Sequence, residues 1–243
     1  MKKTASLIIG ANSSIAKGLA RNIADDNQLL IVITRHDDYY YKQALTNTKV
    51  ISVADYEESE ISRALQLINQ IDNIDIVQIF ICNGMLHSEN CQPEKKLEDF
   101  SQDSFNEVFK ANTITPILWL KALVLQLSFN KPCKIAVLSA RVGSISDNKL
   151  GGWYSYRASK TALNMLLKTA SIELARRAKN IKLISFHPGT TDSPLSKPFQ
   201  KNVPKGKLFS ADFVAQQLVD ISKKAKIDGE LTYVDWQGNL IDW

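Results

Sequence analysis

The chain has 243 residues, a hydrophobic content of 44% and a formal net charge of +5. This length fits one large α/β domain or two small ones, and this composition excludes a disordered chain. The three cysteines show no metal-ligand spacing, so we expect no metal site and a reduced, cytoplasmic setting. The basic residues are mostly scattered, which favours solvated helix faces over a surface for nucleic acid. No run of apolar residues approaches the roughly 18 that span a membrane, and the run 7–9 is too short for a signal peptide.

Short β-branched runs alternate with longer amphipathic segments along the chain. The predicted strands are 6–9, 29–34, 50–53, 76–82, 134–139, 182–187 and 231–234, and the predicted helices are 14–25, 57–70, 104–127, 154–178 and 211–225. Alternation of this kind indicates βαβ units, and continuous apolar strands indicate a parallel sheet covered on both faces. The sequence therefore predicts one doubly wound α/β domain over residues 1–243, with ligands at the carboxyl ends of the strands.

A tyrosine and a lysine stand four positions apart in one predicted helix. Tyr156 and Lys160 therefore share one helix face, whereas Tyr154 lies on another. A lysine ammonium close to a phenol favours the phenolate, so we expect it to lower the pKa of Tyr156 from its ordinary value of about 10. The pair is typical of a general acid/base that works near neutral pH.

A glycine ends the first predicted strand and opens a helix. Gly10 permits a tight turn there, and a helix N-terminus offers free N–H groups to a pyrophosphate. The match to a dinucleotide-binding fingerprint is weakened, because Ser14 and Ala16 stand where that fingerprint usually has glycines. An ordinary turn capped by Asn12 or Ser13 is the alternative. The predicted phosphate-binding residues are Gly10, Asn12, Ser13, Ser14 and Ile15.

Further residues, taken with these motifs, resemble the short-chain dehydrogenase/reductase family. In chain order, the resemblance rests on the stretch 10–16, Asp55, Asn112, the serine region 139–144, Tyr156 with Lys160, and Pro188 with Gly189. More narrowly, the stretches 138–148, 151–160 and 187–192 are similar to those of C-factor-type proteins and sniffer-like carbonyl reductases. The resemblance covers essentially the whole chain. It implies a Rossmann fold with a parallel sheet of about seven strands, which binds NAD(P)(H) and reduces a small-molecule carbonyl compound.

The resemblance assigns roles to residues on two helices. Tyr156 would be the acid that protonates the carbonyl oxygen, and Lys160 would activate it and hold the nicotinamide ribose hydroxyls. Asn112 would support a proton-relay water. Its alternative is a mid-helix polar residue beside a kink at Pro116.

The resemblance also implies which strand-end residues contact the dinucleotide. Asp55 would lie near the adenine ring, or it caps the next helix, or both. The other implied contacts follow the fourth and sixth predicted strands and are Asn83, Gly84, Pro188, Gly189, Thr190 and Thr191.

The serine of the family pattern is the clearest departure. Counting back three residues from Gly143 reaches Ala140, where the family places a catalytic serine. An alanine donates no hydrogen bond to a developing oxyanion, and losing one such donor costs on the order of 2.7–4 kcal/mol of barrier. Ser139 or Ser144 is the candidate substitute.

The end of the second predicted strand bears on the choice of cofactor. Thr34 occupies the position where NAD-specific folds put a carboxylate, and Arg35 follows it. A guanidinium fits a 2′-phosphate, so NADP(H) is preferred over NAD(H). Asp37 and Asp38 lie close by and weaken this prediction, and a solvated loop arginine is the alternative.

The leading hypothesis is thus a cytosolic NADPH-dependent carbonyl reductase. Ala140 and the weakened glycine motif favour an alternative, an NADP(H)-binding regulatory or signalling protein with vestigial catalysis. An epimerase or dehydratase usually needs a longer substrate domain than this chain supplies, and fold analogy alone does not exclude it.

The substrate pocket is expected to draw on two loops, 144–154 and 190–209. The stretch 190–208 is long enough for a mobile substrate loop, and Trp153, Leu195 and Phe199 suggest an apolar or aromatic carbonyl compound. His87 and His187 are expected to be structural or to line the substrate pocket. A homodimer or homotetramer is expected to pair through the helices predicted at 104–127 and 154–178.

Overall fold

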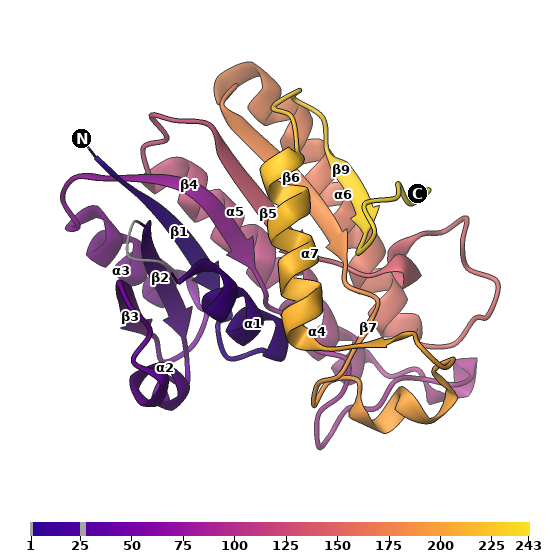
Figure 1. Cartoon of the computed structure of the whole chain (residues 1–243). Coiled ribbons are helices and arrows are strands. Elements are labelled where there is room, and N and C mark those ends of the chain that lie inside the picture. Colours follow the sequence, from indigo (N-terminus) through magenta and orange to yellow (C-terminus); the bar gives the residue numbers. More distant parts are fainter. Residues whose placement is uncertain (1, 25–27) are drawn as a thin grey trace.

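The computed structural model describes residues 2–24 and 28–243. Within them, seven strands form one parallel sheet in the order β3-β2-β1-β4-β5-β6-β9 (Figure 1). The strands are β1 (Lys3–Ile9), β2 (Gln28–Thr34), β3 (Thr48–Ser52), β4 (Ile74–Ile81), β5 (Cys133–Leu138), β6 (Ile181–His187) and β9 (Thr232–Asp235). The order reverses direction between β1 and β4, as in doubly wound folds, so the predicted fold class is confirmed.

Helices cover both faces of this sheet. Helices α1 (Ser14–Ile23), α2 (Asp38–Gln43) and α7 (Ala211–Lys224) lie on one face, and α3 (Glu58–Asn69), α5 (Thr115–Gln126) and α6 (Tyr154–Arg177) lie on the other (Figure 1). Successive strand side chains point to opposite faces, so Ile8 packs with Leu19 and Leu218, whereas Ile9 belongs to the core with Trp119 and Leu163. Burial on both faces explains why the strands are continuously apolar.

The helix predicted over 104–127 is present, but it contains a π-helical turn. The structure has α4 (Gln102–Phe109), a π-helical turn (Lys110–Ile114) and then α5. Pro116 has no N–H to donate to the carbonyl of Asn112, and the N–H of Thr115 reaches back five residues to the carbonyl of Lys110. Among the described residues, the stretch Gln102–Gln126 is long and apolar enough to cross a membrane, but half of it is buried inside the fold, as in a core helix.

The segment after β6 carries structure of its own. Strand β7 (Thr190–Thr191) pairs in parallel with β8 (Leu208–Phe209), and a 3-10 helix, η4 (Lys197–Asn202), lies between them. The ends of the predicted substrate loop are therefore fastened to each other beside the carboxyl end of β6.

Candidate active site

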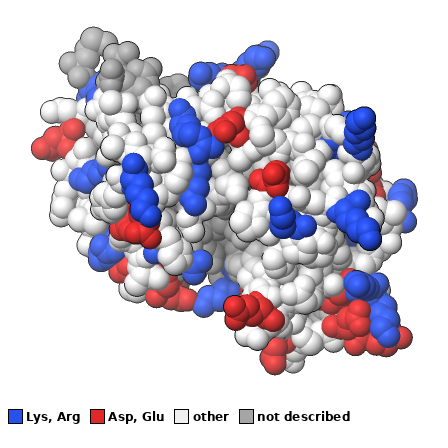
Figure 2. Space-filling view, turned by 60° about the horizontal axis from the view of Figure 1, so that its bottom comes forward, with Lys and Arg blue, Asp and Glu red and all other residues white. Residues whose placement is uncertain are grey.

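A cleft of about 640 Å³ opens at the carboxyl ends of β1, β4, β5 and β6. Figure 2 shows this side of the molecule, where a hollow separates two lobes and basic and acidic side chains are intermixed around it. The reversal of strand order between β1 and β4 creates this crevice, because the connections leave β1 and β4 on opposite faces of the sheet.

One end of the cleft is formed by the turn from β1 into α1. Gly10 has φ +71°, and a Cβ placed on it would lie 2.9 Å from the backbone N of Asn83, so only glycine fits this turn. The hydroxyl of Ser13 caps α1 by accepting from the N–H of Ala16 at 3.2 Å. All five residues predicted for phosphate binding line the cleft, namely Gly10, Asn12, Ser13, Ser14 and Ile15. The start of α1 thus presents a helix N-terminus suited to an anion.

Two cations flank this end of the cleft. The Arg35 guanidinium lies 5.2 Å from the Tyr56 ring centroid, and the Lys17 ammonium lies 5.0 Å from the Tyr39 ring centroid. Arg35, Lys17 and Tyr56 line the cleft. Sequence reasoning missed Lys17 and Tyr56, because their positions follow the motif residues and belong to no pattern of their own.

The acidic residues near this end point elsewhere. Asp55 does not line the cleft; its carboxylate accepts from the N–H of Glu57 at 2.9 Å in the turn before α3, as the capping alternative predicts. Asp37 and Asp38 do not line it either, and the hydroxyl of Ser52 donates to Asp37. Arg35 therefore has no carboxylate competing for it within the cleft lining.

The tyrosine and the lysine lie side by side at the centre of the cleft. Lys160 donates from Nζ to the carbonyl oxygen of Leu138 at 2.9 Å and lies 5.9 Å from the Tyr156 ring centroid. Tyr154 is 38% exposed and does not line the cleft. Spacing on α6 thus brings the predicted pair together and excludes the rival phenol.

The expected lowering of the tyrosine pKa is wrong for the protein alone. Burial raises the pKa of Tyr156 to about 12 and lowers the pKa of Lys160 to about 7. Desolvation disfavours the charged form of each group, and the ammonium is directed at Leu138 rather than at the phenolic oxygen. Burial therefore favours the uncharged form of both side chains, whereas the helical spacing alone predicted a phenolate beside an ammonium.

This buried lysine predicts a pH dependence of stability. Its pKa falls from 10.5 in the unfolded chain to about 7, so between these pH values the unfolded state binds a proton that the folded state does not. The free energy of unfolding should rise with pH across this window, relative to Lys160→Met, by on the order of a few kcal/mol. Urea unfolding from pH 6 to pH 10 measures it, with the exposed Lys168→Met as control. A wild-type-to-variant difference that is constant over this range would contradict the shift.

The asparagine of the π-helical turn supports the cleft from behind. Asn112 is fully buried and does not line the cleft; its Oδ1 accepts from the N–H of Met85 at 2.7 Å, and its Nδ2 donates to the carbonyl of Met85 at 2.8 Å. A Cβ on Gly84 would lie 3.3 Å from Asn112 Oδ1 and 3.5 Å from Lys160 Nζ. Asn112 thus fixes the loop after β4 close to Lys160.

Among the described residues, the serine region places no uncommitted hydroxyl in the cleft. Ala140 lines the cleft directly after β5. Ser139 also lines it, but its hydroxyl donates to Asn164 Oδ1 at 2.8 Å. Ser144 lies outside the cleft lining, and its hydroxyl accepts from the N–H of Asp147. Neither candidate substitute offers an uncommitted hydroxyl to the cleft.

The far end of the cleft is apolar and aromatic. The Phe199 ring makes edge contacts with Trp153 at 5.2 Å and with His87 at 5.7 Å, and Trp153 lies 6.1 Å from Tyr156. Loop residues complete this wall, namely Met85, Leu86, Val142, Leu195 and Val203. Leu195 and Val203 lie in the predicted substrate loop; the other three were not predicted, because they belong to no periodic pattern.

The turn after β6 closes the cleft. The residues predicted there all line it, namely Pro188, Gly189, Thr190 and Thr191. A Cβ on Gly189 would lie 2.8 Å from the Phe209 ring, so the glycine allows this close packing. Among the described residues, Thr191 Oγ1 and Asn83 Oδ1 are buried without a hydrogen-bond partner. Two residues of the cleft lining therefore have a buried polar atom that no described protein group satisfies.

A comparison with protein families decides the relationship. A model of the family described as short chain dehydrogenase matches residues 4–204. The chain belongs to the short chain dehydrogenase family. It is accordingly an NAD(P)-dependent oxidoreductase. Among the described residues, no group of three or more metal-ligating side chains comes together.

Named short chain dehydrogenase relatives are distant in sequence. The 1-hydroxy-2-glutathionyl-2-methyl-3-butene dehydrogenase of Rhodococcus sp. is 26% identical over 79% of this chain and 80% of its own length. An (S)-benzoin-forming benzil reductase of Bacillus subtilis is 24% identical over 93% and 96%. The C-signal protein of Myxococcus xanthus is 29% identical over 42% of this chain and 60% of its own.

Solved structures share the fold over the whole chain. The carbonyl reductase Sniffer of Drosophila melanogaster has a TM-score of 0.83 at 20% identity and covers all of both chains. An NADPH-bound carbonyl reductase from chicken fatty liver has a TM-score of 0.81 at 19% identity, again over both whole chains. These likenesses show the fold of the short chain dehydrogenases.

Proposed function

We propose that this short chain dehydrogenase reduces an aldehyde or ketone to an alcohol with NADPH, in the cytoplasm. The observation that carries the proposal is one cleft that joins a phosphate-type turn at Gly10 to the buried pair Tyr156 and Lys160. When bound, the nicotinamide would supply the hydride. The chain supplies the proton, the orientation and the exclusion of water.

The residues present fit a dinucleotide. The N-terminus of α1 would hold the pyrophosphate, and Asn83 and Thr191, which line the cleft, would lie beside the rest of the cofactor. Arg35 and Lys17 would bind a 2′-phosphate, because both line the cleft and neither makes an ion pair among the described residues. This arrangement supports NADP(H) over NAD(H).

The chain's own part in the reaction is proton supply. With its pKa near 12, Tyr156 is fully protonated at neutral pH, so its hydroxyl donates to the carbonyl oxygen. As negative charge develops on that oxygen, the proton moves from the phenol to it. The pKa of Lys160 is about 7, so its amine carries a proton in a fraction of molecules at neutral pH. The protonated amine stabilises the phenolate that remains. Asn112 holds the loop beside Lys160 in place.

The substrate end favours an apolar, aromatic carbonyl compound. Trp153 and Phe199 form a wall next to Tyr156, and flat rings gain from edge or offset contacts with such side chains. The benzil reductase relative acts on a compound of this class.

A cofactor-oxidation screen tests the proposal. NADPH and NADH are each mixed with the protein and with aromatic aldehydes, aryl ketones, 1,2-diketones and quinones, and loss of absorbance of the reduced cofactor is followed. NADPH oxidation with aryl carbonyl compounds is the expected result. Binding of NADPH without its oxidation over the whole panel would overturn the reductase proposal.

A regulatory NADP(H)-binding protein is the second candidate, and Ala140 favours it. Ala140→Ser tests the missing donor: under this second candidate, kcat should rise by about tenfold or more, since one oxyanion donor is worth 10²–10³ in rate at best. The control is Ser144→Ala, which lies outside the cleft lining. A weak wild-type rate that Ala140→Ser strongly increases would support the regulatory role, whereas a fast wild-type rate would count against it.

We also propose that two copies pair through the outward faces of α5 and α6. Four large apolar side chains are exposed there, Leu125, Met165, Leu166 and Ile172. Burying such side chains favours association. Light scattering on the purified protein measures the oligomeric state, and a monomer at micromolar concentration would contradict the pairing.

A further inference from the structure

Among the described residues, the serine region offers no free hydroxyl to a substrate oxygen beside Tyr156. Ala140 offers only a methyl group, and the hydroxyl of Ser139 is engaged by Asn164. The same Asn164 Oδ1 also accepts from the hydroxyl of Ser185 on β6 at 2.7 Å, so Ser139 is part of a buried network. A second donor to a developing oxyanion is worth 10²–10³ in kcat where it has been removed from an enzyme. Another group of this chain would have to supply it.

One half-buried imidazole stands beside this position. His187 ends β6, where it pairs with Asp235 of β9, and its neighbour Phe186 pairs with Leu138 of β5. The N–H of Ser139 donates to the carbonyl of Phe186 at 2.8 Å, which places the start of the serine region next to His187. His187 lines the same cleft as Ala140 and Tyr156.

The imidazole keeps hydrogen-bonding capacity. Among the described residues, His187 Nδ1 is buried and has no hydrogen-bond partner. Buried polar atoms without partners are uncommon, and here no described protein group competes for this ring at Nδ1. A neutral imidazole carries one N–H donor and one acceptor nitrogen, so it can donate to a carbonyl oxygen.

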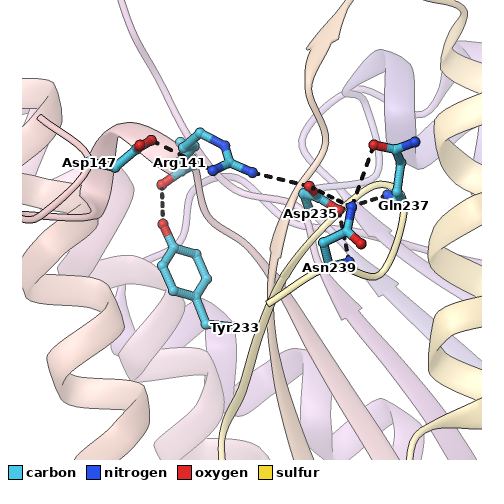
Figure 3. Close-up of polar contacts among 7 residues, drawn as sticks. Arg141, Asp147, Tyr233, Asp235, Gln237 and Asn239 are labelled. Atoms are coloured by element: carbon cyan, nitrogen blue, oxygen red, sulfur yellow. Dashed lines mark hydrogen bonds and ion pairs between the residues drawn. The ribbon is translucent and has the colours of Figure 1, made fainter. Parts of the chain in front are cut away.

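Burial, assisted by the guanidinium of a nearby charged network, keeps the His187 ring neutral. Arg141 bonds Asp235 at 3.0 Å and lies 3.7 Å from Asp147, and the Asp235 carboxylate also accepts from backbone N–H groups of the turn that follows it (Figure 3). Burial and the Arg141 guanidinium lower the pKa of His187 to about 4, against the smaller opposite effect of Asp235 and Asp147. The ring is therefore uncharged at neutral pH.

The same network fixes the backbone at Ala140. Tyr233, on β9, donates from its hydroxyl to the carbonyl oxygen of Ala140 at 2.7 Å (Figure 3). The ring of Tyr233 stacks on Trp243 at 5.2 Å, which joins the chain's last residue to this support. The position of Ala140 is thus set by the Tyr233 side chain of β9 and by the backbone bond of its neighbour Ser139 to β6.

We propose that His187 donates a hydrogen bond from its imidazole N–H to the carbonyl oxygen of the substrate, in the role left open by Ala140. This inference rests on the proposed reductase function. In the reaction the carbonyl carbon gains the hydride, the carbonyl oxygen gains the proton of Tyr156, and His187 keeps its own proton throughout. Its contribution is to orient the carbonyl and to stabilise the negative charge that develops on the oxygen.

Rates of variants test the role. His187→Ala should lower kcat by about 10²–10³-fold, and His187→Gln, which retains an N–H donor, should lose much less. Ala140→Ser should raise kcat far more in the His187→Ala background than in the wild type, since one donor then replaces the other. Ser222→Ala is the matched control, because Ser222 is a buried polar residue of α7 that has no hydrogen-bond partner within the described part of the chain and lies outside the cleft lining. NADPH affinity, measured by fluorescence, should be unchanged in all four variants.

Binding of benzamide in the presence of NADP⁺ provides a readout independent of turnover. Its amide carbonyl accepts hydrogen bonds but is not reduced, and His187→Ala should weaken its Kd by about tenfold. Unchanged kcat and unchanged benzamide affinity in His187→Ala would overturn the inference alone. So would equal losses in His187→Ala and His187→Gln without rescue by Ala140→Ser. A wild type that binds benzamide through His187 but oxidises no NADPH would overturn the proposed reductase function alone.

Discussion

Tyr156→Phe is expected to lower kcat for carbonyl reduction by about 10²–10⁴-fold, the usual contribution of a positioned general acid. The change removes one hydroxyl and keeps the ring that contacts Trp153 at 6.1 Å, so the cleft wall should remain intact. NADPH affinity should therefore stay close to that of the wild type. Steady-state kinetics on the best aryl carbonyl of the screen, with NADPH fluorescence titration, measure both quantities.

The neighbouring phenol provides the control for this variant. Tyr154→Phe makes the same chemical change on the same helix, but Tyr154 lies outside the cleft lining. Its kcat should equal that of the wild type. Turnover by Tyr156→Phe at the wild-type rate would show that the proton comes from another group and would refute the mechanism.

Arg35→Glu is expected to raise KM for NADPH by about 100-fold and to leave KM for NADH nearly unchanged. The guanidinium would otherwise make charge-assisted hydrogen bonds to the 2′-phosphate, and a carboxylate there repels that phosphate and suits a ribose hydroxyl. The packing of Arg35 on Tyr56 at 5.2 Å shows that the side chain is already held at this end of the cleft. Kinetics with both cofactors measure the switch.

Two further variants sharpen this result. Lys17→Glu, at the opposite side of the same end, should shift the preference in the same direction but less, since an ammonium binds phosphate as a point charge. Arg176→Ala removes an exposed cation at the distant end of α6 and should change neither KM. Equal effects of Arg35→Glu on both cofactors would show that Arg35 supports the fold of the cleft rather than the 2′-phosphate.

The strands were predictable because their physics is local. A strand buried on both faces must be apolar at every position, as Ile8 and Ile9 show by packing into opposite cores, and such runs are visible in the sequence. The π-helical turn between α4 and α5 was harder to predict from the sequence. Pro116 indicated that the helix is irregular near this point. Whether the helix kinks, ends or forms a π-helical turn depends on the tertiary packing around the buried Asn112.

The site was predictable where backbone geometry dictates the residue. Gly10 and the spacing of Tyr156 and Lys160 are requirements of a turn and of a helix face, so the sequence displays them. The direction of the tyrosine pKa was not predictable, because burial outweighs a lysine that points at Leu138. The sequence left two roles open for Asp55, because a carboxylate near a helix start can bond its own backbone as well as a ligand.

The pairing of β7 with β8 has a consequence for how specificity can diverge. The N–H of Asp192 donates to the carbonyl of Phe209 at 2.8 Å, and Phe209 packs on Trp236 at 4.3 Å, so both ends of the stretch 190–209 are fastened at one point. A segment closed on itself in this way can change length and sequence between its ends with little effect on the sheet. Exchange of residues 193–207 between related reductases should therefore transfer substrate preference as a unit, while the cofactor end stays as it is.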